Sequence, residues 1–261
     1  MGYVPIFFAM HELTTQDYQA GWRLVCDLTE AASDAVSFAR QGTLDLPQLV
    51  ASEITTLSVC DLARHTRSVV SNPAGAISAR EREGFDHFFD EHPLVRYHAD
   101  RAGADAHRIT DSMPQSKFRE SALYNEYYKR IGIDYVIAVP LFVDRGLLVS
   151  FVLNRNRLDF SDRERALLDL VKVPLGALYR NLLARGREAR GFASLPVTPR
   201  EREVLSWLAA GKTDKDIGQI LAMSPRTVQK HLQHIYEKLG VETRTAAVVR
   251  AMEIGSGSRP A

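Results

Sequence analysis

The segment TPREREVLSWLAAGKTDKDIGQILAMSPRTVQKHLQHIYEKLG, residues 198–240, contains start and stop signals for three helices. Residues 198–201 (TPRE) are a capping box with proline at the first helical position. Gly211 suits the left-handed residue that ends the first helix, and Thr213 and Ser224 can cap the next two. The sequence therefore predicts three short helices with tight connections.

The third of these helices is amphipathic. Four apolar residues at helical spacing predict its buried stripe: Val228, Leu232, Ile235 and Leu239. The opposite face carries two carboxamides and a lysine, the residue types that bind adenine and guanine edges in the major groove. A short helix, a tight turn and a longer helix with such a face are typical of a helix-turn-helix. The alternative is a small helical bundle whose polar face is only solvated.

Residues 196–254 also resemble the LuxR/GerE-type DNA-binding domain, through TPREREVL at 198–205, AGKT at 210–213, and KLGV at 238–241. The resemblance implies a fourth helix from Thr243 that pairs two such domains on DNA. It implies base reading by Gln229, Lys230 and Gln233. It implies phosphate contacts by Lys212, Arg226, Thr227 and Lys238. A lysine usually occupies the position of Gln229 in this family, so the departure should change the DNA sequence that is read.

Composition and charge support two dissimilar halves. A chain of 261 residues with 45% hydrophobic and 25% charged residues is typical of two folded domains. Residues 1–184 hold 20 Lys and Arg against 24 Asp and Glu, whereas residues 185–261 hold 13 against 8. The basic excess of the second half favours an anionic partner such as nucleic acid.

No membrane span, cofactor or metal site is expected. The longest apolar stretch, 135–153, is interrupted by Asp144-Arg145-Gly146, a hairpin turn between two strands. The two cysteines form no CxxC pair, and an acidic and histidine-containing segment, 86–92, is better interpreted as a solvated helix end than as a metal site. With neither a catalytic constellation nor a phosphate loop, the chain is expected to be a cytoplasmic protein without enzymatic activity.

The N-terminal half mixes helix and strand signals, which predicts an α+β domain with an antiparallel sheet. Helices are expected over 14–40, 47–54, 80–91, 116–130 and 161–184, the last with a kink at Pro174. Strands are expected over 55–63, 68–70, 135–143 and 147–153.

The stretch 135–181 is similar to the end of a GAF domain, through its two strands, Phe160-Ser161 and the closing Tyr179-Arg180-Asn181. The expected organisation is therefore a GAF/PAS-like sensor and dimerisation domain (1–184), a linker (185–197) interrupted by Gly, Pro and Ser, a four-helix LuxR-type domain (198–254) and a flexible tail (255–261).

A GAF-like fold implies a ligand pocket between the sheet and its covering helices. The aromatic residues that could line such an effector pocket are Tyr97, Phe118, Tyr124, Tyr127 and Tyr128. The alternative is that these rings are simply the core under the sheet.

Taken together, these features predict a sequence-specific transcriptional regulator that binds double-stranded DNA as a homodimer and senses a small molecule or a partner. Two alternatives remain: a receptor for an acyl-homoserine lactone or related autoinducer, or a ligand-independent DNA-binding dimer. Lactone receptors carry a Trp/Tyr/Asp/Trp constellation in the sensor half, whereas this half has a single tryptophan, Trp22.

Overall fold

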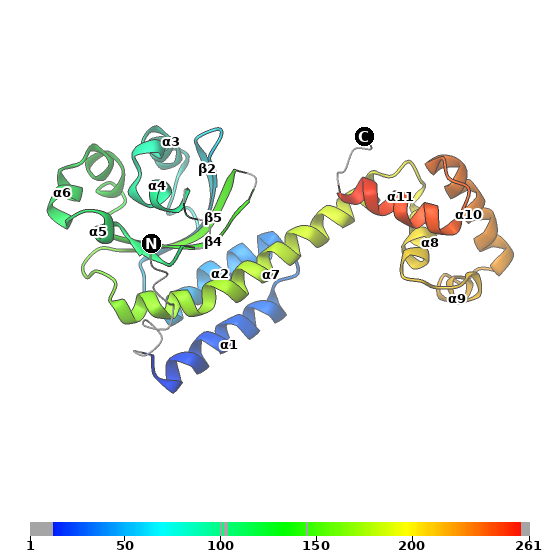
Figure 1. Cartoon of the computed structure of the whole chain (residues 1–261), viewed down its shortest axis with the longest axis horizontal. Helices are drawn as coiled ribbons and strands as arrows, with labels where there is room; N and C mark the ends of the chain where they lie inside the picture. The colour runs from blue at the N-terminus through cyan, green and yellow to red at the C-terminus, as the bar shows by residue number, and fades with distance from the viewer. Residues whose placement is uncertain (1–12, 100, 102–103, 145, 257–261) are drawn as a thin grey trace, which may run out of the picture. The chain divides into compact units, whose positions relative to one another are not determined.

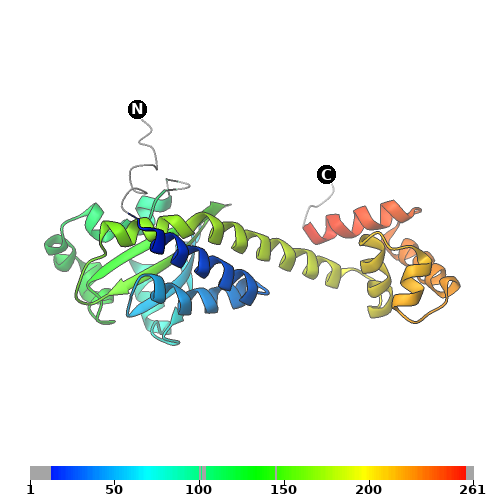
Figure 2. The same cartoon turned by 90° about the horizontal axis from the view of Figure 1, so that it is seen from below.

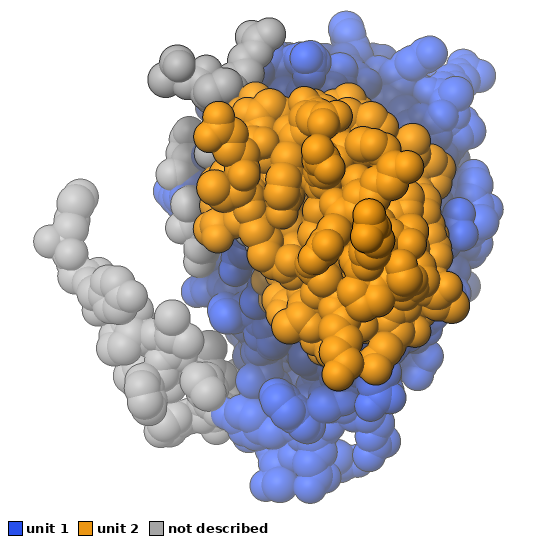
Figure 3. Space-filling model, turned by 90° about the vertical axis from the view of Figure 1, so that its right-hand side faces the viewer, with its two compact units in different colours: residues 1–180 blue, residues 181–261 orange. Residues whose placement is uncertain are grey.

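The computed structural model describes residues 13–256 except 100, 102, 103 and 145. The chain divides into two compact units, residues 1–180 and 181–261 (Figure 3). The first unit is an α+β domain and the second is all-α (Figure 1). The fold class expected from the sequence is confirmed for both.

The N-terminal unit is built on a five-stranded antiparallel sheet. Its spatial order is β2-β1-β5-β4-β3. The strands are β1 (Ile54–Asp61), β2 (Thr66–Asn72), β3 (His107–Arg108), β4 (Tyr135–Asp144) and β5 (Leu147–Arg155). Because successive side chains alternate between the two faces of a sheet, each strand contributes to two different layers of packing.

One face of the sheet is covered by the long helices α2 (Ala35–Leu49) and α7 (Asp162–Ser194), and α1 (Thr15–Ala31) packs against these two helices on the side away from the sheet (Figures 1 and 2). Phe151 of β5 is fully buried there, with its ring 5.7 Å from that of Phe38. Gly42 of α2 lies against the same ring, and a Cβ at this position would be 2.5 Å from it. Helix α2 can therefore approach the sheet closely only because residue 42 has no side chain.

The other face is covered by shorter helices, which lie opposite α2 and α7 in Figure 1. They are α3 (Ala79–His87), η2 (Phe89–Glu91), α4 (Pro93–Ala99), α5 (Ile109–Ser112), α6 (Gln115–Glu120) and the π-helical turn η3 (Tyr124–Tyr128). Their apolar side chains form a core cluster with this face of the sheet. Each helix is too short to be stable alone, so packing rather than helix propensity holds this layer.

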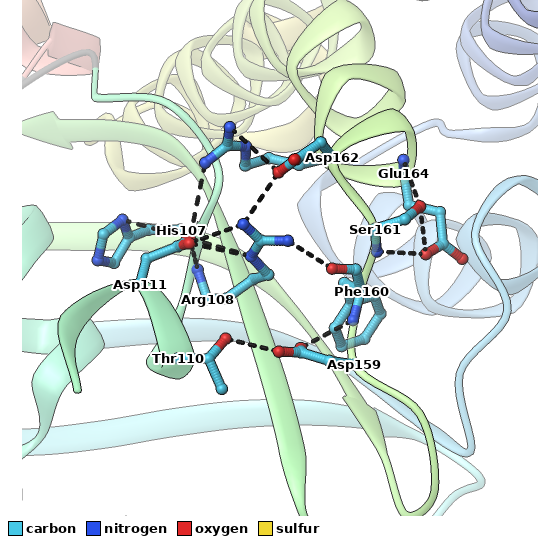
Figure 4. A network of polar contacts seen from close by, with 10 residues as sticks. His107, Arg108, Thr110, Asp111, Asp159, Phe160, Ser161, Asp162 and Glu164 are labelled. Carbon is cyan, nitrogen blue, oxygen red and sulfur yellow. Dashed lines mark hydrogen bonds and ion pairs between the residues drawn. The ribbon is translucent and has the colours of Figure 1, made fainter. Parts of the chain in front are cut away.

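An ion-pair network ties β3 and α5 to the start of α7 (Figure 4). The Arg108 guanidinium lies 2.7 Å from Asp111 and 3.0 Å from Asp162, and it donates to the carbonyl oxygen of Phe160 at 2.6 Å. Thr110 adds a hydrogen bond to Asp159 at 2.6 Å. One arginine thereby joins the short strand at the sheet edge to the loop that precedes α7.

The C-terminal unit contains α8 (Pro199–Ala209), α9 (Asp214–Ile220), α10 (Pro225–Leu239) and α11 (Arg244–Ser256). All caps expected from the sequence form: Thr198, Thr213 and Ser224 accept main-chain hydrogen bonds, and Gly211 is left-handed with φ +76°. Twelve buried residues form the core, with Val204, Leu205, Ile217, Val228 and Ile235 fully enclosed. Ile220, the last residue of α9, is 45% exposed.

Two boundaries differ from the sequence-based expectation in the helical layer. A single helix over 14–40 is wrong: the chain breaks at residues 32–34, where Asp34 accepts hydrogen bonds from Val36 and Ser37 and starts α2. Helix α2 then continues past residue 40, through Gly42, to Leu49. The second expected helix, 47–54, is instead the end of α2 followed by the start of β1.

Most of the expected linker at 185–197 is helical, because α7 continues through residue 194. Leucine, alanine and arginine favour helix strongly enough to outweigh the cost of about 1 kcal/mol for each of the two glycines. The helix is likewise continuous through Pro174. At the other end α11 reaches Ser256, and the rest of the expected tail lies outside the described residues.

Candidate functional site

The turn between α9 and α10 is held by a close backbone contact at Gly218. A Cβ at this position would lie 2.7 Å from the carbonyl oxygen of Met223, whose N–H donates to the Gly218 carbonyl at 2.8 Å. Ala222 adopts a left-handed conformation with φ +54°. The main-chain N–H of Thr227 then donates to the Ser224 hydroxyl at 3.1 Å, which starts α10.

Helix α10 buries one face and exposes the other, as the sequence predicts. Its buried residues are Val228, Leu232, Ile235 and Leu239. Gln229, Lys230 and Gln233 are exposed, at positions that share the outward face of the helix. Arg226 and Thr227 are exposed at its N-terminus. The structure therefore brings all three expected base-reading residues onto one accessible surface.

The expected phosphate-contacting residues separate into two groups. Lys212, Arg226 and Thr227 are exposed. The Lys238 ammonium instead lies 2.6 Å from the carboxylate of Glu201, which is only 3% exposed. Burial would raise the pKa of Glu201, but hydrogen bonds from Lys238 and Thr198 outweigh it and hold this pKa below its usual value. Lys238 therefore joins α10 to α8 while its side chain is still exposed, and its expected phosphate contact stays a prediction.

The N-terminal unit contains a small cavity of about 30 Å³ between the sheet and the α3–α4 layer. Six polar side chains line it: Ser58, Arg67, His92, His98, Tyr128 and Ser150. The strand register explains part of this set, because Ser58 pairs directly with Ser150 and Cys60 pairs with Arg67. A volume of this size accommodates about one or two water molecules.

Arg67 is the charged residue of this cavity and is only 8% exposed. Its Nη2 donates to the Tyr127 hydroxyl at 2.8 Å, and its Cζ lies 3.6 Å from the centroid of the Phe85 ring. Its main-chain N–H donates to Asp86 at 2.9 Å. Its Nε, however, is buried without a hydrogen-bond partner.

Two buried histidines complete the polar lining. His92 accepts from the main-chain N–H of Leu94 through Nδ1 at 3.2 Å, so its Nε2 carries the proton and donates to the Tyr128 hydroxyl at 2.7 Å. Neither ring nitrogen of His98 has a hydrogen-bond partner. Burial lowers the pKa of both His92 and His98 to about 3, so each ring is neutral.

The aromatic set expected to line an effector pocket is only partly brought together. Tyr128 lines the cavity. Phe118, Tyr124 and Tyr127 pack around it as core, with the Phe118 and Tyr128 ring centroids 5.3 Å apart. Tyr97 lies elsewhere: it lines a surface pocket with Arg96 and Arg101, and its ring stacks on His107 at 3.5 Å. The three tyrosines of η3 have different partners: the Tyr124 hydroxyl donates to Asp134, the Tyr127 hydroxyl accepts from Arg67, and the Tyr128 ring lines the cavity.

The site residues expected from the sequence did not include Arg67, His92 and His98. Polar residues in an edge strand, in a short helix or between two short helices are usually solvated. A signal was present in β1, where Thr56, Ser58 and Cys60 alternate with apolar residues. Both Thr56 and Ser58 are only 2% exposed, so this alternation marks a polar buried face rather than a solvent-exposed one.

In the described ranges, no group of three metal-ligating side chains occurs, and no helix is both long and apolar enough to cross a membrane. The acidic and histidine side chains of the segment 86–92 instead make separate contacts with other residues. Asp86 accepts from Arg67, Asp90 lies 2.9 Å from His65, and His92 is buried against Tyr128.

Residues 195–251 match the family model for bacterial regulatory proteins of the luxR family. A putative HTH-type transcriptional regulator of Mycobacterium bovis, Mb0914c, is 49% identical over 74 residues, 28% of this chain and 8% of that protein. RpaR of Rhodopseudomonas palustris, a quorum sensing-dependent transcriptional regulator, is 30% identical over 149 residues, 56% of this chain and 59% of RpaR. The chain thus spans less than two thirds of the length of these relatives.

Among solved structures, the LBD domain of VqsR from Pseudomonas aeruginosa is similar over 62% of this chain and 97% of that chain, with 15% identity and a TM-score of 0.48. The matched residues 195–251 contain all four helices of the second unit up to position 251, including the turn at Gly218 and the exposed face of α10. The C-terminal unit of this chain therefore carries a domain of the luxR family of bacterial regulatory proteins.

Proposed function

We propose that this chain is a transcriptional regulator that binds double-stranded DNA through α10. The observation that carries the proposal is the exposed set Gln229, Lys230 and Gln233, held outward by a buried apolar stripe and a tight preceding turn. Carboxamides bind adenine edges and lysine binds guanine, and a helix of this size fits the major groove. Lys212, Arg226 and Thr227 would contact phosphates, which orient the helix without reading sequence.

The N-terminal unit would sense a small molecule in the cavity beside Arg67 and would contribute to a homodimer. A cavity lined by unpartnered polar atoms supports an effector over a purely structural role for this unit. A regulator of chromosomal genes would act in the cytoplasm, and the proposal includes no catalytic step. Large apolar side chains exposed on the helical layer, among them Trp22 on α1 and Val173 on α7, support an association surface.

The name of RpaR suggests an autoinducer as one class of effector. Trp22, the tryptophan that a lactone-binding constellation would need, is 68% exposed on α1 and does not line the cavity. The structure therefore gives this alternative no support from Trp22.

The experiment that tests the proposal is selection of bound sites from random DNA duplexes with the full-length protein. We expect enrichment of one sequence motif, arranged as two related half-sites if the protein binds as a homodimer. Gln233→Ala should change or relax the motif, whereas Lys117→Ala in the N-terminal unit should not. Binding without any enriched motif would contradict sequence-specific recognition by α10.

A further inference from the structure

The guanidinium of Arg67 lies inside the N-terminal unit without a carboxylate partner. Arg67 is 8% exposed, and no ion pair joins it to an acidic side chain within the described part of the chain. The guanidinium contacts a phenol oxygen and an aromatic ring face, neither of which carries a full negative charge, whereas the Asp86 carboxylate accepts only the main-chain N–H of Arg67. Because a buried charge is stable only when it is paired, this position favours an anion from outside the chain.

Three hydrogen-bond donors with free capacity line the same cavity. The Nε–H of Arg67 has no partner, and neutral His98 offers one N–H with neither ring nitrogen occupied. The Tyr128 hydroxyl accepts from His92, so its own proton remains for a further acceptor. A cavity with three free donors and no carboxylate in its lining favours a ligand whose hydrogen-bond acceptor carries a negative charge.

Beside Ser58, Ser150 and His92, the remainder of the cavity wall is largely apolar and limits the size of the occupant. Leu94 and Val95 of α4 contribute from one side, and Val152 of β5 contributes from the sheet. A volume of about 30 Å³, the space of one or two water molecules, matches little more than the carboxylate group itself, so α4 must yield slightly for each added carbon atom. A long acyl chain would require α4 to move away from the sheet.

We propose that this cavity binds a small aliphatic carboxylate, whose oxygens accept hydrogen bonds from Arg67, His98 and Tyr128 while its short hydrocarbon part contacts Leu94 and Val95. The idea that this ligand is an effector rests on the sensing role proposed above. The idea that the ligand binds here rests only on the cavity and its unpartnered donors.

The test is a thermal-unfolding titration of the full-length protein with sodium acetate, propionate and butyrate. The matched amides acetamide, propionamide and butyramide serve as neutral isosteres, all at the same sodium concentration and pH. We expect the carboxylates to raise Tm by about 5–10 °C at a hundredfold excess over Kd, with no rise for the amides. Equal responses to acids and amides, or no response to any acid, would overturn the proposal.

Two substitutions assign the effect to the cavity. Arg67→Met removes the charge at similar length and should weaken carboxylate binding at least tenfold while the protein stays folded by circular dichroism. Arg64→Met, in the exposed turn of the same hairpin, is the matched control and should bind normally. If Arg67→Met does not fold, Tyr128→Phe, which removes one hydroxyl, should still lower the affinity. A Tm response that persists in both folded variants would show that the anion acts elsewhere and would overturn the site.

DNA affinity, measured in the same samples, separates this inference from the proposed function. If carboxylates bind without changing DNA affinity, the binding site is supported but its regulatory role is contradicted. The alternative effector is a neutral lactone, such as N-hexanoyl-homoserine lactone. If this lactone shifts DNA affinity and carboxylates do not bind, the sensing role is supported and the carboxylate site is overturned.

Discussion

The Nζ of Lys238 lies 2.6 Å from a carboxylate oxygen of Glu201, so the end of α10 is joined to the start of α8 by a charged hydrogen bond. The same carboxylate accepts the main-chain N–H of Thr198 at 2.8 Å. One buried side chain thus caps one helix and anchors another.

Lys238→Met should lower the free energy of unfolding of the C-terminal unit by about 1–3 kcal/mol, because the Glu201 carboxylate stays buried without its cation. Urea unfolding measures the effect. Lys230→Met, an exposed lysine on the same helix, is the control and should change stability little. Equal stability of the two variants would show that the pair contributes nothing.

Lys230→Ala should lose about 1–3 kcal/mol of affinity for the selected DNA site and discriminate less at one base position, as expected for a base contact. Lys212→Ala should weaken binding to all sequences alike and reduce the salt dependence by about one counterion. Binding isotherms at several salt concentrations on cognate and scrambled duplexes distinguish the two. A uniform loss for Lys230→Ala would remove it from the base-reading set.

Gly218→Ala should destabilise the C-terminal unit, although alanine normally favours a helix by about 1 kcal/mol over glycine. The added Cβ would lie 2.7 Å from the Met223 carbonyl oxygen, so the α9–α10 turn must shift. Gln219→Ala, at the exposed neighbouring position, serves as the control in thermal unfolding. A stabilised Gly218→Ala protein would mean that the turn relaxes without cost.

His98→Leu should reduce the loss of stability in acid. Burial lowers the pKa of His98 to about 3, below its unfolded value near 6.5, so the neutral ring stabilises the fold above pH 6.5. This contribution is lost as the pH falls from 6.5 towards 3, by up to about 1.4 kcal/mol per pH unit. Urea unfolding of both proteins across this range should show a shallower slope for the leucine variant, and equal slopes would contradict a buried neutral His98.

Trp22→Ser should weaken self-association if the exposed layer of α1, α2 and α7 forms the homodimer. Leu158→Ser is a matched control, because Leu158 is 73% exposed but lies in the loop after β5 rather than on this layer. Sedimentation velocity over a concentration series compares the two variants with the unmodified protein. A wild-type monomer at all concentrations, or equal effects of both substitutions, would contradict this surface.

The C-terminal unit was predictable almost residue by residue, because its information is local. Each helix has a capping residue within one turn, and the buried stripe of α10 repeats at helical spacing. The Lys238–Glu201 pair was not predictable, because it joins residues 37 positions apart on two helices. Local patterns contain no information on which charged side chain another helix will cover.

The N-terminal unit was harder to predict from the sequence, for a related reason. The paired strands β4 and β5 were clear, but β3 has two residues and α4 and α5 have seven and four. Elements this short depend on packing rather than on propensity. The cavity could not be predicted for the same reason. Thr56, Ser58 and Arg67 lie on a buried face, but in the sequence they have the pattern of a strand with one solvated face, and only the covering layer shows that they are buried.

The unpartnered charge of Arg67 also bears on how long the protein survives in the cell. A chain that keeps an unpaired cation in its interior loses part of its small stability margin, and binding of an anion would restore it. Since degradation often follows the population of opened molecules, resistance to proteolysis would rise when the cavity is filled. The abundance of the protein would then follow the supply of its ligand, independently of any change at the DNA.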